Sequence, residues 1–159
     1  MIIGNGDIAS VLPNREDLLF FAAGVSNSQE TRESEYDRDK DLLLKQDRNK
    51  HIVYFSSLSI FYSNTRYTKH KRIMEFLVKN CFENYTIIRI GNITWGTNPN
   101  TLINFFKAHP KAKIKDEYRY VCDKDEFLHW INLIPKWGVE MNIPGRRMKV
   151  ADIKREYCE

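Results

Sequence analysis

The sequence predicts an α/β fold in which helices flank a parallel sheet, with residues 1–159 in one domain. Short apolar runs alternate with longer amphipathic stretches, and this alternation is typical of parallel strands joined by crossover helices. Turn-forming residues bound the apolar runs. A chain of 159 residues with 42% hydrophobic residues buries enough surface for one compact core, and two full domains are not expected.

The expected elements follow from these runs in chain order. The run 51–55 (HIVYF) is short and apolar, and it predicts a buried strand. The stretch 29–48 carries leucines on a charged background and predicts a helix with a solvated face. A basic loop is expected after the helix that ends at Phe106. The expected strands are 1–3, 17–24, 51–55, 85–90 and 139–143, and the expected helices are 29–48, 66–81, 101–106, 123–133 and 150–157.

Charge and cysteine content argue against several classes of protein. The net charge of +4 is spread along the chain, and the lysines between 107 and 115 are more typical of a solvated loop, so no nucleic acid is expected as a partner. Cys81, Cys122 and Cys158 lie far apart outside any metal-ligand spacing, which indicates reduced thiols and no metal. No segment approaches the ~20 apolar residues of a membrane span, and no leader pattern opens the chain. A soluble, cytoplasmic protein is expected.

A glycine turn follows the first expected strand. Gly4, Gly6 and Ala9 form a GxGxxA pattern that is expected to open a helix. In a dinucleotide site the first glycine permits the tight turn, and the second lets the backbone approach the pyrophosphate. Free N–H groups at the start of the helix then hold the phosphates. A glycine turn without a ligand would give the same pattern.

Tyr67 and Lys71 are spaced to lie on one face of the helix expected at 66–81. A nearby ammonium favours the phenolate, so the tyrosine could exchange a proton with a substrate hydroxyl near neutral pH. The pairs Tyr36–Lys40 and Tyr120–Lys124 have the same spacing, so spacing alone does not select the first pair. Its context does, because only Tyr67 follows a buried strand that ends in hydroxyl groups.

The strand expected at 51–55 runs into Ser56, Ser57 and Ser59. Open α/β sheets bind ligands at the carboxyl ends of their strands, where a serine could hydrogen-bond the oxygen that the tyrosine protonates. The alternative is that the serines cap the strand and that Tyr67 and Lys71 lie on a wet helix face.

These residues together resemble the extended short-chain dehydrogenases/reductases, and in particular the NAD-dependent epimerase/dehydratase family, which acts on sugar nucleotides. The resemblance runs in order along nearly the whole chain. It comprises the glycine turn, Phe21-Ala22-Ala23-Gly24, the Ser-Ser strand end, Tyr67-x-x-x-Lys71-x-x-x-Glu75, Arg89-Ile90-Gly91-Asn92-Ile93 and Tyr120-Val121-Cys122-Asp123.

The resemblance implies a role for each matching residue. Tyr67 would be the catalytic acid/base, and Lys71 would stabilise its phenolate and bind the nicotinamide ribose. Ser57, or Ser59 if the loop is shifted, would orient the substrate. The glycines of the turn would hold the pyrophosphate of NAD or NADP, and the end of the second strand would line the cofactor cleft. These cofactor-binding positions are Gly4, Gly6, Ala23 and Gly24.

The chain departs from the family between Gly6 and the second strand. About a dozen residues stand where the family has its second and third βα units, so the expected fold is a minimal Rossmann-like sheet without an adenosine pocket. The strands would run in the order 1-2-3-4 with the first strand at an edge. An open edge beside the apolar segment Ile8–Leu12 predicts a homodimer, unless residues 12–15 fold back over it.

Two functions are compatible with the sequence. The resemblance implies an NAD(P)-dependent oxidoreductase or epimerase/dehydratase that acts on a sugar nucleotide, in the synthesis of bacterial surface polysaccharides. The alternative is a non-catalytic binding or scaffold subunit that has lost dinucleotide binding. Serine, tyrosine and lysine in the family order favour the enzyme, and the missing strands favour the scaffold.

Overall fold

The computed structural model describes residues 1–159 and contains a larger and a smaller sheet. The larger sheet has five parallel strands in the order β1-β2-β3-β4-β7. The expected order 1-2-3-4 with the first strand at an edge is therefore confirmed, and β7 extends the sheet beyond β4. These strands are β1 (Ile2–Ile3), β2 (Leu19–Phe21), β3 (Ile52–Ser57), β4 (Tyr85–Ile90) and β7 (Val139–Ile143).

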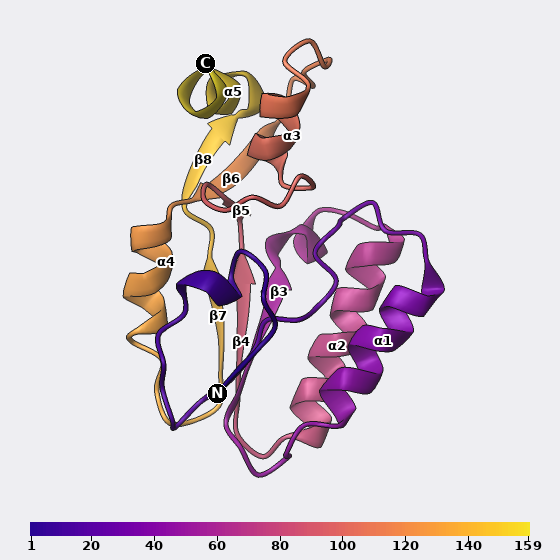
Figure 1. Ribbon diagram of the computed structural model, residues 1–159, viewed down its shortest axis with the longest axis vertical. Helices are drawn as coiled ribbons and strands as arrows, with labels where there is room; N and C mark the ends of the chain where they lie inside the picture. The colour runs from indigo at the N-terminus through magenta and orange to yellow at the C-terminus, as the bar shows by residue number, and fades with distance from the viewer.

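Helices cover both faces of this sheet (Figure 1). The helices α1 (Glu33–Leu44) and α2 (Arg66–Cys81) pack side by side on one face, and α4 (Lys124–Ile131) lies on the other. The start of α2 is sharply defined, because the Thr65 side chain accepts a hydrogen bond from Thr68 N, and Thr65 N donates to the Thr68 hydroxyl. None of the helices is long and apolar enough to cross a bilayer.

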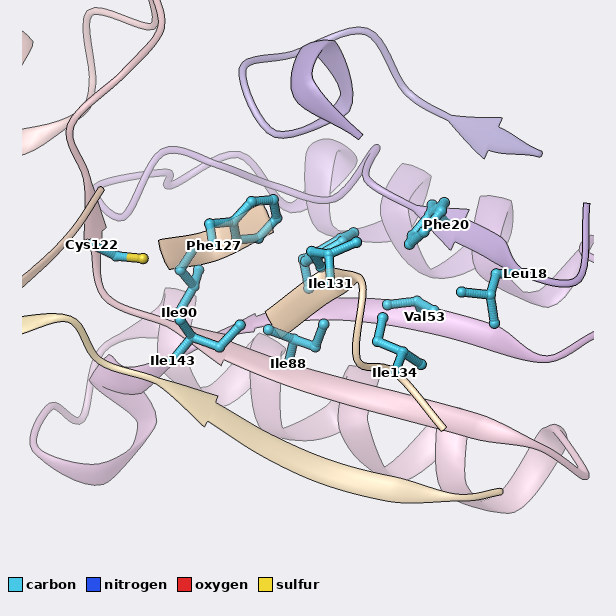
Figure 2. Packing of buried hydrophobic residues seen from close by; sticks show 11 residues of the cluster. Leu18, Phe20, Val53, Ile88, Ile90, Cys122, Phe127, Ile131, Ile134 and Ile143 are labelled. Carbon is cyan, nitrogen blue, oxygen red and sulfur yellow. The ribbon is translucent and has the colours of Figure 1, made fainter. Parts of the chain in front are cut away.

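Alternate residues of the strands supply two hydrophobic cores. Phe20 points to the core shared with α4, while its neighbour Phe21 points to the core shared with α1 and α2, as the period of two in a strand requires. Figure 2 shows the first core, in which Phe127 and Ile131 of α4 lie over Ile88 and other strand residues. Strands buried on both faces explain the continuous apolar runs in the sequence.

The segment after β1 packs inside the protein. Ile8, Val11 and Leu12 contact the core that is shared with α4, and Ala9 is buried. The N-terminal amine donates to Arg15 O and Leu18 O, so the chain folds back along the first strand. The segment Ile8–Leu12 is therefore not the exposed apolar surface that the sequence predicted for a dimer contact.

The smaller sheet was not predicted. It has the order β5-β6-β8, with β5 parallel and β8 antiparallel to β6. The helices α3 (Leu102–Ala108) and α5 (Val150–Cys158) pack against it, and together they form the lobe beyond the carboxyl ends of the larger sheet (Figure 1). Its strands are β5 (Asn92–Ile93), β6 (Tyr118–Cys122) and β8 (Arg146–Lys149).

Candidate active site

Tyr67 and Lys71 lie one turn apart on the buried face of α2. Their exposed fractions are 9% and 4%, and Lys71 Nζ lies 5.5 Å from the centroid of the Tyr67 ring. The cap at Thr65 places Tyr67 in the first turn of the helix, just beyond the carboxyl end of β3. The structure thus brings together the two side chains that the sequence singled out, and the wet helix face that was the alternative is not found.

The Tyr67 hydroxyl has no hydrogen-bond partner in the chain. Its ring packs with Val25 and Tyr36, and these contacts hold the phenol in place. Tyr67 keeps 9% of its surface exposed, and its hydroxyl is not fully buried. A positioned hydroxyl that is free and accessible is suited to proton exchange with a bound ligand.

Lys71 is enclosed more completely than Tyr67. Its ammonium donates to Phe55 O (3.3 Å) and lies 5.3 Å from the centroid of the Tyr54 ring. Burial alone would lower the pKa of this ammonium, but Tyr54, Tyr67 and Asp39 outweigh burial and hold the pKa above its ordinary value. Lys71 therefore carries a positive charge beside the Tyr67 phenol.

Asp39 and His70 belong to the same buried region, and the sequence reasoning missed both. Asp39 is fully buried, accepts a hydrogen bond from Val25 N (3.1 Å) and lies 2.8 Å from His70 Nε2. Burial would raise the pKa of the Asp39 carboxyl, but the contacts with His70, Lys71 and Val25 N hold it below its ordinary value. The spacing of Asp39 from Tyr36 and Leu43 places it on the buried face of α1, and this was the available signal.

The two candidate serines bind each other. The Ser57 and Ser59 hydroxyls are 2.7 Å apart, and Ser57 Oγ also accepts a hydrogen bond from Ser59 N (3.1 Å). This contact turns the end of β3 into the short 3₁₀ helix η2 (Leu58–Phe61). Neither hydroxyl is hydrogen-bonded to Tyr67, so the structure leaves the choice between them open.

Ser56 and Glu75 take part in a buried hydrogen-bond network with Arg89. Glu75 accepts hydrogen bonds from the Ser56 hydroxyl (2.6 Å) and from Nη2 of the Arg89 guanidinium (2.5 Å), and all three residues are buried. The network joins α2 to β3 and β4 on the face that carries Lys71. Glu75 and Arg89, which belong to the motifs noted in the sequence, therefore connect the helix to the sheet, and we call the Ser56–Glu75–Arg89 network the clamp.

The glycine turn after β1 differs from the expectation. It does not open an α-helix, because only the three-residue 3₁₀ helix η1 (Ala9–Val11) follows, so no helix N-terminus faces a ligand there. Gly4 has φ +117°, and a Cβ at this position would lie 2.4 Å from Ala22 O. Gly4 is therefore required by the turn itself and by its contact with the end of β2.

Gly6 is not required by the fold in this way. It does not have a positive φ, and a Cβ at this position would meet nothing within 4 Å. The turn is exposed here, and none of the backbone N–H groups between Asn5 and Ile8 donates to a backbone carbonyl. An open backbone with unpaired N–H groups is the chemistry that a diphosphate requires.

Asp7 fastens this turn to the loop after β5. Its carboxylate accepts hydrogen bonds from Thr97 N (3.0 Å) and Asn98 N (2.8 Å), and Asp7 O accepts one from the Trp95 indole (3.0 Å). Gly96, with φ +95°, gives Asp7 the space that it needs, because a Cβ there would overlap the carboxylate. The turn is thus held rigid by residues that are about 90 positions away in the sequence.

The residues present fit one half of a dinucleotide. The open turn at Gly6 suits a diphosphate, and the Tyr67 hydroxyl and the Lys71 charge suit the nicotinamide end. Gly24 lies directly over Lys71, since a Cβ there would approach Nζ to 3.3 Å, whereas Ala23 O accepts hydrogen bonds from the Arg38 guanidinium. The adenosine half has no counterpart, because the chain returns to β2 without the strands that would hold it.

Two hollows of about 350 and 370 Å³ lie at the other end of the sheet. Their walls come from residues that precede the strands, among them Asp17, His51 and Asn84, whereas Tyr67 follows the end of β3. The hollows therefore do not belong to the candidate site.

The sequence matches no known family profile and no curated protein. The fold, however, matches solved structures. The enzyme WbmG of Bordetella bronchiseptica, in complex with NAD and UDP, superposes with a TM-score of 0.68 at 14% identity, over 87% of this chain and 55% of that one. The UDP-glucose 4-epimerase of Thermus thermophilus, in complex with NAD, gives 0.61 at 12% identity, over 86% and 59%.

A third structure is the capsular polysaccharide assembling protein CapF of Staphylococcus aureus, with a TM-score of 0.56 at 18% identity, over 87% of this chain and 44% of that one. The chain spans about half the length of these proteins. The likeness confirms the expected α/β, Rossmann-like fold. The structural neighbours include UDP-sugar 4-epimerases and enzymes solved in complex with NAD, the kind of protein that the motifs indicated.

Proposed function

We propose that the chain is an enzyme of the short-chain dehydrogenase/reductase type that acts on a sugar nucleotide with NAD or NADP. The observation that carries the proposal is the free Tyr67 hydroxyl one helical turn from a buried, charged Lys71, at the ligand-binding edge of a parallel sheet. The sugar-nucleotide epimerases among the structural neighbours support the same substrate class. The capsular polysaccharide assembling protein CapF supports a place in the synthesis of surface polysaccharides, which we place in the cytoplasm.

Each residue of the site has a role in this proposal. Tyr67 exchanges a proton with a hydroxyl of the sugar, and the Lys71 charge stabilises the phenolate that this exchange leaves. Ser57 or Ser59 orients the sugar oxygen. The turn at Gly4 and Gly6 would hold the diphosphate of the cofactor, with Ala23 and Gly24 lining the cleft. When bound, NAD(P) would supply the acceptor and donor of the hydride.

Alanine substitutions at the two glycines of the turn test whether Gly4 is needed by the fold and Gly6 is not. Gly4→Ala is expected to lower the free energy of unfolding by at least about 2 kcal/mol, since φ is positive and the Cβ overlaps Ala22 O. Gly6→Ala should leave stability within about 0.5 kcal/mol, because nothing surrounds the added methyl group. Urea titration measures both. Equal losses in the two variants would show that the turn is structural throughout.

A non-catalytic binding or scaffold subunit is the second candidate. One observation favours it: Lys71 bonds Phe55 O and is enclosed by the protein, so its ammonium does not present itself to a cofactor ribose. Incubation with NAD(P) and a panel of UDP-sugars separates the two candidates. Epimerised, dehydrated or oxidised sugar detected by chromatography supports the enzyme, and unchanged sugars at high protein concentration support the scaffold.

A homodimer remains part of the proposal, but on a surface other than the expected one. Ile73 and Phe76 are large apolar side chains on the outer face of α2, with exposed fractions of 47% and 63%. Lys69 is exposed on the same helix, and Asp37 and Asp41 are exposed on the neighbouring α1. In a twofold dimer the acidic α1 of each chain meets the basic α2 of the other, while the apolar residues pack between them.

Phe76→Glu is therefore expected to halve the mass in solution. Light scattering at micromolar concentration should give twice the 18.9 kDa of the chain for the natural protein and a single mass for the variant. Leu133→Glu is the control, because Leu133 is also exposed (56%) but follows α4 on the opposite face of the sheet. A single mass for the natural protein at all concentrations would contradict the dimer.

A further inference from the structure

A buried polar cluster surrounds Lys71, and the proposed function uses only part of it. Asp39 from α1, Tyr54 from β3 and His70 from α2 are buried beside Lys71, with exposed fractions between 0% and 3%. The Asp39 Oδ1 atom has no hydrogen-bond partner in the chain. A buried polar atom without a partner costs folding free energy, so its presence calls for a functional or electrostatic explanation.

Lys71 and Asp39 border the same point beneath the backbone of Gly24. A Cβ at Gly24 would lie 3.3 Å from Lys71 Nζ and 3.6 Å from Asp39 Oδ1. The ammonium and the carboxylate do not form a direct ion pair, because each is hydrogen-bonded to another group. Lys71 Nζ donates to Phe55 O, and Val25 N donates to Asp39 Oδ2. The carboxylate oxygen without a partner is thus left near the ammonium.

Two buried carboxylates lie near Lys71, but Glu75 is already paired with Arg89, so Asp39 is the carboxylate left to balance the Lys71 charge. The titratable groups that face it are Asp39 from α1, Tyr54 from β3, and Tyr67 and His70 from α2. The phenol of Tyr54 is neutral, because burial raises its pKa above the ordinary value. Burial without an opposite charge lowers the pKa of an ammonium and favours the neutral amine. Asp39 is therefore the group that compensates Lys71.

We propose that Asp39 is the buried counterion that keeps Lys71 protonated, and hence a positioning residue for the charge beside Tyr67. His70 and the backbone N–H of Val25 orient the carboxylate, and Gly24 leaves room for the two charges to share one small space. The positive charge on Lys71 is then balanced by a residue of the same chain and does not depend on a bound cofactor. The positioning role rests on the proposed function of Tyr67, whereas the charge of Lys71 can be measured without any turnover.

The test reads the charge on Lys71 directly. The Lys71 side chain is followed by NMR of lysine-labelled protein during a pH titration, and the signal that is missing from Lys71→Arg identifies it. Asp39→Asn is expected to lower the titration midpoint of Lys71 by at least about one pH unit, because burial then acts without compensation. Asp41→Asn, an exposed change on the same helix, should not move it. An unchanged Lys71 midpoint in Asp39→Asn would overturn the proposal.

A stability measurement covers the case in which Asp39→Asn does not fold. Lys71→Met leaves the carboxylate without its opposite charge, and the double variant Asp39→Asn/Lys71→Met removes both. If the two charges compensate each other, the double variant has a higher urea midpoint than either single variant, or is soluble where they are not. Losses that simply add in the double variant would contradict the pairing.

Discussion

Replacing Tyr67 with phenylalanine is expected to lower turnover by a factor of about 10² to 10⁴ while the fold persists, since the change removes only the hydroxyl that exchanges the proton. The structure supports an intact fold, because the hydroxyl makes no hydrogen bond in the chain and the ring keeps its contacts with Val25 and Tyr36. Turnover of a UDP-sugar identified from the substrate panel, and circular dichroism of the same samples, measure the two quantities.

Tyr118→Phe is the appropriate control for this variant. Tyr118 is exposed and belongs to the smaller sheet, so its hydroxyl has no part in the site. Tyr36, which matches Tyr67 in its spacing to a lysine, is unsuitable, because it packs against Tyr67 and its hydroxyl donates to Glu30 O (2.7 Å). Full activity in Tyr67→Phe would remove Tyr67 from the proposed chemistry.

Loss of the buried clamp between α2 and the sheet should have the largest effect on stability. Glu75→Ala is expected to lower the free energy of unfolding by about 3–5 kcal/mol, because it leaves the Arg89 guanidinium buried without its main partner. The Ser56 hydroxyl loses its acceptor in the same change. Chemical unfolding monitored by tryptophan fluorescence measures the loss.

Glu33→Gln provides the comparison for the clamp. Glu33 pairs with Arg66 at 2.7 Å, a distance similar to that in the buried network, but the Glu33 side chain is 65% exposed and that of Arg66 is 37% exposed. Solvent-exposed pairs contribute about 1 kcal/mol or less, so the loss should be several times smaller than in Glu75→Ala. Similar losses in the two variants would mean that the buried pair has no special weight in the fold.

The centre of the larger sheet could be predicted from the sequence because β2, β3 and β4 are buried on both faces and so form largely apolar runs. The runs at 51–55 and 85–90 correspond to β3 and β4, and the expected helix at 66–81 coincides with α2. The smaller sheet could not be predicted in this way. Its strand β8 (RRMK) is mostly charged, β5 has two residues, and β6 is exposed at its start, so none gives a clear apolar pattern.

The site shows the same division between local and distant information. The spacing of Tyr67 and Lys71 and their position after a buried strand were sufficient to predict that the two side chains lie together. Asp39 lies 32 positions before Lys71, and only the packing of α1 on α2 makes the two neighbours. The glycine turn was recognised, but the helix expected after it was not formed, since the 12 residues between Gly6 and β2 must also cover a core and return to the sheet.

Calorimetric titration with NAD, nicotinamide mononucleotide and AMP tests the central claim, that this chain keeps the nicotinamide half of a dinucleotide site and lacks the adenosine half. The account predicts that NAD and nicotinamide mononucleotide bind with affinities within about tenfold of each other, a difference of about 1.4 kcal/mol. AMP should not bind measurably, and Gly6→Ala should weaken both of the other ligands. Failure of NAD to bind at millimolar concentration, or binding of AMP as tight as that of NAD, would contradict it.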